Sequence, residues 1–176
     1  MRGKLLLHSV VASSALLGAL VTAPQAGATE KPIEKPTVTL SADADANTRM
    51  IVAEDPSAVA AAATICGAGF DKVSQVKPLP EGVDPRERLA ALFTYIGNNG
   101  RGCALLDNNA VGKKYMHVGV CDIDGKNCDT DSGYFSEHAG PVYVPKVACA
   151  PVTAKAGQSP SSLYINFTSR YVFPCN

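Results

Sequence analysis

The stretch that decides the fold is CDIDGKNCDTDSGYFSEHAGPVYV, residues 121–144. Two cysteines flank an Asp-Gly turn, and alternating residues follow the second cysteine up to Gly140-Pro141. An Asp-Gly pair between two short strands is a strong signal for a β-hairpin. We therefore predict a stapled hairpin whose second strand is broken by Gly140-Pro141, with a further strand starting at residues 142–144.

Residues 115–121, just before this stretch, alternate in polarity. Met116, Val118 and Val120 fall on one face, and more polar or small residues fall on the other, as is typical of a half-buried strand. Its predicted partner is residues 129–136. Similar short runs at residues 163–167 and 171–175, with turn signals about every eight to twelve positions, predict an all-β fold, a small disulfide-stapled sandwich or barrel.

Two segments favour helix. Residues 57–65 are rich in alanine, and Ser57 can cap them, so we expect a short N-terminal helical segment. Residues 84–87, Asp-Pro-Arg-Glu, carry a helix-start signature, whereas residues 93–96 are rich in β-forming side chains. The sequence leaves this conflict open, and we favour a brief helical turn followed by a strand from about Leu89.

The first 28 residues contain the three parts of a cleavable secretory signal. Arg2 and Lys4 precede a mostly apolar run at residues 5–21, and small residues follow at positions 26–28. A retained anchor would need about twenty apolar residues, and polar side chains interrupt this shorter run. We expect cleavage after Ala28, a secreted protein, and no membrane span after cleavage.

Residues 29–56 differ in composition from the rest of the chain. They repeat a Glu-Lys-Pro unit and lack aromatic residues and cysteines. Such a segment buries too little apolar surface to offset its chain entropy, so we predict a flexible arm ahead of a β domain at residues 57–176. Without residues 1–28, fourteen basic residues face sixteen acidic ones, and no basic run predicts nucleic-acid binding.

All six cysteines lie beyond the signal segment, and an even number in an exported chain indicates three disulfides. They are Cys66, Cys103, Cys121, Cys128, Cys149 and Cys175. Zinc ligation would need closely spaced cysteine pairs with partner histidines, which the spacing does not provide. Six cysteines allow fifteen pairings, and these observations leave the pairing open.

The acidic loop between Asp122 and Asp131 is the one candidate metal site. Its carboxylates surround Gly125, and oxygen-rich loops of this kind can hold calcium. The EF-hand pattern fails, because Val120 falls at the first ligand position and Asp131 falls where a bidentate glutamate belongs. We predict no metal and no cofactor, although the sequence does not decide the calcium question.

His117 and His138, with Glu137 or Asp131, can be combined on paper into an acid-base site. The chain has neither a Gly-x-Ser-x-Gly elbow nor a His-Glu-x-x-His motif. The expected disulfides leave no thiolate nucleophile. We therefore assign no catalytic residues and expect no enzymatic activity.

Tyrosines supply the remaining candidate site. Flat aromatic rings stack on the C–H faces of sugars, so Tyr95, Tyr115, Tyr134 and Tyr143 form a candidate ligand face. Tyrosines on strands are also common as half-buried sheet residues with a solvated hydroxyl. The sequence contains no tryptophan, the strongest platform for a sugar.

Several segments taken in order resemble the spore-associated protein A family of secreted actinomycete proteins. They are Ile65-Cys-Gly-Ala-Gly-Phe70, Leu92-Phe-Thr-Tyr-Ile-Gly-Asn-Asn-Gly100, Thr130-Asp-Ser-Gly-Tyr-Phe135, Ala139-Gly-Pro-Val-Tyr143, Cys149 and Cys175. The resemblance covers about residues 62 to 176. It implies a small secreted protein of the spore surface, and it brings no catalytic residues.

The cysteines shared with that family imply two disulfides, Cys66 to Cys103 and Cys149 to Cys175, which leaves Cys121 with Cys128. The function expected first is a secreted structural or surface protein of the spore or cell envelope. The alternatives are an extracellular module that binds cell-wall glycan or another envelope component and, least favoured, a small exported enzyme. Ligand and oligomeric state stay open.

Overall fold

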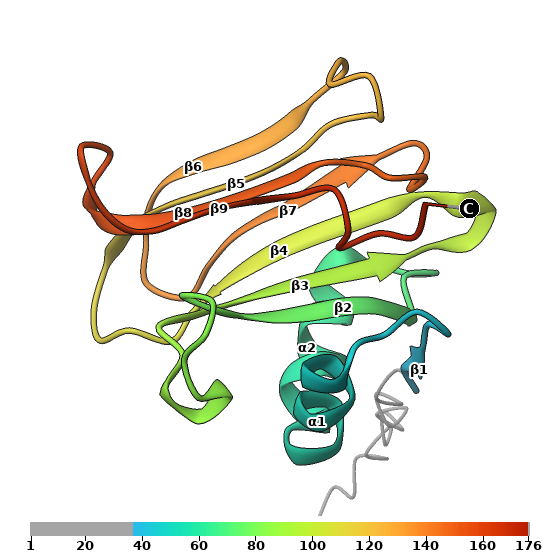
Figure 1. Ribbon diagram of the computed structural model, residues 1–176, viewed down its shortest axis with the longest axis horizontal. Coiled ribbons are helices and arrows are strands. Elements are labelled where there is room, and N and C mark those ends of the chain that lie inside the picture. Colours follow the sequence, from blue (N-terminus) through green and yellow to red (C-terminus); the bar gives the residue numbers. More distant parts are fainter. Residues whose placement is uncertain (1–36, 176) are drawn as a thin grey trace, which may run out of the picture. The chain divides into compact units, whose positions relative to one another are not determined.

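The computed structural model describes residues 37–175, which form two β-sheets and two short α-helices (Figure 1). The elements in chain order are β1 (Thr39–Leu40), α1 (Ala46–Glu54), α2 (Pro56–Cys66), β2 (Lys72–Leu79), the 3-10 helix η1 (Pro85–Glu87), β3 (Ala90–Ile96), η2 (Asn98–Gly100), β4 (Gly102–Asn108), β5 (Lys114–Val120), β6 (Asp129–Phe135), β7 (His138–Val144), β8 (Val152–Ser159) and β9 (Ser162–Ser169). The predicted all-β class is confirmed. The expected signal segment and residues 29–36 lie outside the described residues.

One sheet has the strand order β1-β2-β3-β4-β7, and the other has the order β6-β5-β8-β9. Every pair is antiparallel except β1 with β2. The two sheets lie over one another, and α1 and α2 lie on the far side of the five-stranded sheet (Figure 1). They do not close into a barrel.

The core between the sheets follows the alternation read from the sequence. Met116, Val118 and Val120 of β5 are fully buried there, and they meet Leu92 and Leu106 from β3 and β4. Because successive side chains on a strand point to opposite faces, the residues between these positions on β5 face away from the core. The predicted strand at residues 115–121 and its partner at residues 129–136 are therefore both found, as β5 and β6.

A second core lies between the helices and the other face of the five-stranded sheet. Ile51 of α1 and Val59 of α2 pack with Phe93, Tyr95 and Leu105 from β3 and β4. Residues on both faces of β3 are consequently buried, from Ala90 through Tyr95, which is why this stretch shows no polar alternation. The five-stranded sheet is thus covered on both faces.

The three disulfides are Cys66–Cys103, Cys121–Cys128 and Cys149–Cys175, and none of the six cysteines is free. This is the pairing that the family resemblance implies. The first bond joins the end of α2 to β4, and the second spans the turn between β5 and β6. The third bond joins the loop after β7 to the C-terminal segment after β9.

The expected flexible arm is not found in residues 37–56. Asp45 caps α1 by accepting a hydrogen bond from Thr48 N at 2.8 Å, and Thr48 and Ile51 are buried. Thr48 Oγ1 accepts a hydrogen bond from Val76 N of β2 at 2.9 Å. Val76 lies further along β2 than the residues that pair with β1. The prediction from composition is wrong for this part of the chain, because a few buried contacts hold in place a segment that is polar on average.

Three local features bear on predictions made from the sequence. The helical turn and following strand expected at residues 84–96 are found as η1 and β3. Asp55, not Ser57, caps α2 through a hydrogen bond from Ala58 N at 3.1 Å. The predicted break at Gly140-Pro141 is wrong, because β7 runs through it and accommodates it by a register shift against β4.

Candidate functional site

The outer face of the four-stranded sheet is not covered by any helix or strand of residues 37–175. We call this surface the open face, and we define it by the strand positions that alternate with those facing the core. Its residues are Tyr115, His117 and Gly119 on β5, Thr130, Ser132 and Tyr134 on β6, Thr153, Lys155 and Gly157 on β8, and Asn166 and Thr168 on β9. It is the natural place to look for a ligand.

The register of the sheet arranges these residues in rows across the strands. The rows are Ser132-His117-Lys155-Asn166, Thr130-Gly119-Thr153-Thr168 and Tyr134-Tyr115-Gly157. Directly opposed residues on antiparallel strands have Cβ atoms roughly 4.5–5.5 Å apart. Hydroxyl, amide and basic groups therefore form a continuous polar band beside an aromatic pair.

Tyr115 and Tyr134 form that aromatic pair. Their ring centroids are 5.8 Å apart with an interplanar angle of 68°, an edge-to-face arrangement. Tyr134 is 55% exposed. Gly157 pairs in turn with Leu163 of β9, where the register shifts. The β9 backbone occupies the space of a side chain at Gly157, since a Cβ there would lie 2.1 Å from Ser162 O. The backbone of β9 therefore borders one edge of the Tyr115–Tyr134 pair.

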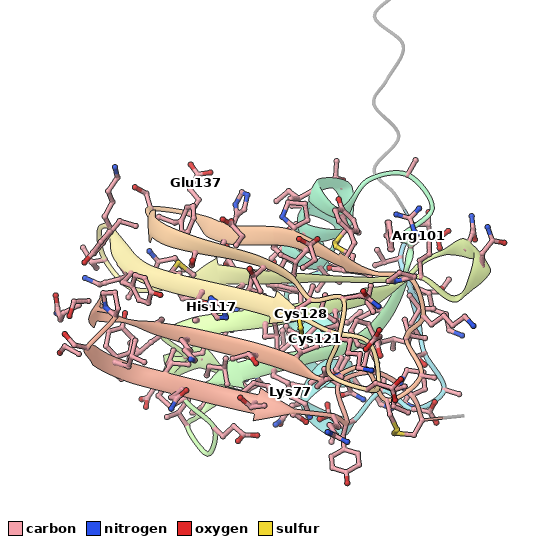
Figure 2. All side chains as sticks on the ribbon, turned by 90° about the horizontal axis from the view of Figure 1, so that it is seen from above. Lys77, Arg101, His117, Cys121, Cys128 and Glu137 are labelled. Carbon is pink, nitrogen blue, oxygen red and sulfur yellow. A yellow bond between two sulfur atoms is a disulfide. The ribbon has the colours of Figure 1, made fainter. Side chains whose placement is uncertain are left out.

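His117 lies among the strands of this sheet (Figure 2). Its ring reaches toward Gly119, since a Cβ at that position would lie 3.3 Å from His117 Nε2 and 3.0 Å from Thr130 Cγ2. Partial burial is the main cause that lowers the pKa of His117 below its ordinary value, and the charge of Lys155 acts in the same direction. Asp131 opposes both.

The acidic residues of β6 are turned away from the open face. Asp129 accepts a hydrogen bond from Tyr143 N at 2.8 Å, and Asp131 accepts one from Gly140 N at 2.7 Å. Both donors belong to β7 of the other sheet. None of the open-face positions defined above is acidic, so Lys155 is the only formal charge on them at neutral pH.

The four tyrosines predicted as a ligand face do not share one surface. Tyr95 is fully buried, donates a hydrogen bond to Val59 O at 2.6 Å, and has a pKa raised by that burial, so it offers nothing to a ligand. Tyr143 belongs to the five-stranded sheet and donates to Cys66 O. Only Tyr115 and Tyr134 lie together.

Tyr143 belongs instead to a structural cluster near the first disulfide. Its ring lies 5.6 Å from that of Phe70. The guanidinium of Arg101, which is labelled in Figure 2, lies 5.3 Å from the Phe70 centroid. This is cation–π geometry, and it uses the exposed arginine to cover two rings. The contacts explain Tyr143 without a ligand.

The two histidines weighed for catalysis lie on different sheets, His117 on β5 and His138 on β7. His138 stands in register with Asp107 of β4. Burial raises the pKa of Asp107, and the charges of His138 and Arg88 oppose this effect. The structure therefore does not assemble His117 and His138 in one site.

Two shallow hollows lie on the described surface, one beside the open face at Asn166 and the other away from it. One, of about 230 Å³, is lined by Leu79, Pro80, Glu81, Tyr164, Ile165, Asn166 and Phe167. The other, of about 220 Å³, is lined by Asp43, Gln75, Tyr171, Phe173, Pro174 and Cys175. Each is lined by one carboxylate, Glu81 or Asp43, and neither brings His117 or His138 together with it.

In the acidic loop, the carboxylate of Asp122 binds groups of the loop itself. Asp122 accepts hydrogen bonds from Lys126 N and from Asn127 Nδ2, each at 2.8 Å. Within residues 37–175 no three His, Cys, Asp or Glu side chains come together as a metal site would require. The Asp122 carboxylate thus stabilises the Cys121–Cys128 turn.

Sequence reasoning did not single out Lys155, Ser132 or Asn166. The signal for Lys155 was present, because Val152, Ala154 and Ala156 alternate with Thr153 and Lys155 along β8. Small alanines made this alternation weaker than that of β5. The rows themselves depend on strand register, which no local pattern reveals.

Comparison with known protein families, with curated proteins and with solved structures finds no match. The resemblance to the spore-associated protein A family stays a prediction. Among the described residues no helix is long and apolar enough to cross a membrane. The interpretation of the open face accordingly rests on its geometry.

Proposed function

We propose that this chain is an extracellular surface protein of the cell or spore envelope, without catalytic activity, that attaches to an envelope glycan through the open face. The observation that carries the proposal is the unequal covering of the two sheets. Helices and the second sheet cover both faces of the five-stranded sheet, whereas the outer face of the four-stranded sheet is free of any described element.

The chemistry of the open face suits an extended glycan. Tyr134 and Tyr115 offer apolar ring area to a pyranose, and the neighbouring rows offer hydroxyl, amide and ammonium groups to sugar hydroxyls. A seven-residue strand spans about 23 Å, enough for several sugar units in line. The face is long and shallow, which favours a polymer over a small enclosed ligand.

The disulfides support a location outside the cell. Bridged cysteines are typical of oxidising compartments, and each bridge contributes about 2–4 kcal/mol to stability by the chain-entropy account. The expected signal segment and the family resemblance also predict a location outside the cell. A binding protein that persists on an exposed surface benefits from such crosslinks.

Co-sedimentation tests the proposal. The mature protein is mixed with purified cell-wall sacculi, and the bound fraction is compared with that of a Tyr115→Ala, Tyr134→Ala double variant. We expect wild-type binding and about a tenfold weaker affinity of the double variant, because two stacking rings are lost. Tyr171→Ala is the matched control, since Tyr171 is 79% exposed but lies outside the open face.

Failure of the wild-type protein to sediment with the sacculi would contradict the proposal. Equal binding by the double variant and the Tyr171→Ala control would place the contact elsewhere on the surface. Far-ultraviolet circular dichroism checks that the double variant keeps the sheet structure of the wild type.

A further inference from the structure

We propose that the open face selects an acidic polysaccharide, with a sugar ring stacked at Tyr134 and Tyr115 and a ring carboxylate received by Lys155 and His117. This inference rests on the proposed function and adds the chemical class of the ligand. It follows from where the charges of the four-stranded sheet lie.

The charge on the open face has one sign. Lys155 stands in the middle of its row, between His117 of β5 and Asn166 of β9. The nearest acidic residues, Asp129 and Asp131, are held on the opposite side of β6 by backbone N–H groups of β7. A ligand on this face therefore meets an ammonium group and no carboxylate from its strand positions.

The spacing of the aromatic pair and the basic pair suits a polymer of charged rings. Tyr115 and His117 are two residues apart on β5, which places them about 7 Å apart along the strand. A ring stacked at the tyrosines would thus leave the carboxylate of the next sugar beside His117 and Lys155. A polymer of acyclic phosphodiesters has no ring for the tyrosines, so a uronic-acid type of chain fits better.

His117 adds a dependence on pH. Burial lowers the pKa of His117, and the charge of Lys155 on β8, which faces it, acts in the same direction. The charge of Asp131, held on the opposite side of β6, acts against both. His117 is consequently neutral at neutral pH and gains its proton as the solution becomes more acidic. Sugar carboxylates stay ionised meanwhile, so affinity should rise as pH falls from 7.5 to 5.

Two probes with the same backbone test the inference: oligogalacturonate and its methyl ester, in which the carboxylates are neutral. Isothermal titration calorimetry should show that the wild-type protein binds the acid about fivefold more tightly than the ester at low salt. Lys155→Gln should remove this preference. Lys146→Gln, an exposed lysine outside the open face, should keep it.

The same titrations at pH 5 and pH 7.5 examine His117. Affinity of the wild-type protein for the acid should be higher at pH 5, and His117→Gln should bind with nearly equal affinity at both values. If His117→Gln keeps its fold by circular dichroism but no longer binds the acid more tightly at pH 5 than at pH 7.5, the result supports the inference.

Equal affinity for acid and ester, or an unchanged preference in Lys155→Gln, would overturn the inference. If the protein sediments with cell walls in a Tyr134-dependent manner yet binds acid and ester alike, the acidic ligand is wrong and the proposed function stands. If it neither sediments with walls nor binds either probe, both are wrong.

Discussion

Asp131 of β6 accepts a hydrogen bond from Gly140 N of β7 at 2.7 Å, although the two strands belong to different sheets. Asp129 makes the equivalent bond with Tyr143 N. β7 is an edge strand, and exposed edge N–H groups invite pairing with other chains. The two carboxylates therefore close this edge and hold the sheets together at one side.

Removing the Asp131 carboxylate should destabilise the protein. Asp131→Ala leaves Gly140 N without its acceptor, and we expect a loss of about 1–3 kcal/mol in the free energy of unfolding. Urea denaturation measures it. Asp124→Ala is the control, because Asp124 is exposed in the loop, and it should change stability by less than about 0.5 kcal/mol. Equal effects of the two substitutions would show that the bond contributes nothing.

The contact between α1 and β2 gives a second prediction. Thr48 Oγ1 accepts from Val76 N at 2.9 Å and donates to Asp45 Oδ1 at 2.7 Å, and Thr48 is fully buried. Thr48→Val keeps the shape but leaves a buried N–H unpaired, which should cost about 1–3 kcal/mol. Thr64→Val, on the exposed side of α2, serves as the control. A thermal unfolding midpoint unchanged by Thr48→Val would restore the flexible-arm interpretation.

The disulfides should differ in their contributions. Cys121 and Cys128 are seven residues apart, whereas Cys66 and Cys103 are 37 apart, and a longer closed loop restricts the unfolded chain more. Replacing Cys121 and Cys128 by alanine should lower the free energy of unfolding by about 2 kcal/mol. Replacing Cys66 and Cys103 by alanine should lower it by about 4 kcal/mol. Guanidinium denaturation of both double variants ranks them. If replacing Cys121 and Cys128 costs more than replacing Cys66 and Cys103, the hairpin disulfide stabilises the protein by more than the closure of its own short loop explains.

The extent to which the sequence predicts this molecule depends on how local each feature is. The alternation of Met116, Val118 and Val120 predicts β5 because strand period and burial agree. Tyr95 shows the limit: it lies on a strand as expected, yet α2 covers its face, and no local pattern reports that covering. The open face is similarly invisible, since its rows exist only after four strands pair.

The histidine on the open face makes stability depend on pH. The pKa of His117 is lowered in the folded state, mainly by burial and then by Lys155, so the unfolded chain binds its proton more readily. The contribution of His117 to the free energy of unfolding is complete above its pKa in the unfolded chain, about 6.5. It falls as the pH decreases from there toward the lower pKa of the folded state. His117→Gln should show a flatter stability profile in that window than the wild type, measured by urea denaturation at pH 5 to 7.5. A profile identical to that of the wild type would contradict this assignment.

We propose that an envelope glycan binds at the open face of the four-stranded sheet. A titration of ¹⁵N-labelled protein with soluble fragments of the purified cell wall, followed by NMR, tests it most directly. We predict that shift changes concentrate on Tyr134, Ser132, Tyr115, His117 and Lys155, and that the amides of α1 and α2 stay unchanged. Changes that centre on the helices or on the hollow beside Leu79 and Tyr164, with the open face unaffected, would contradict the claim.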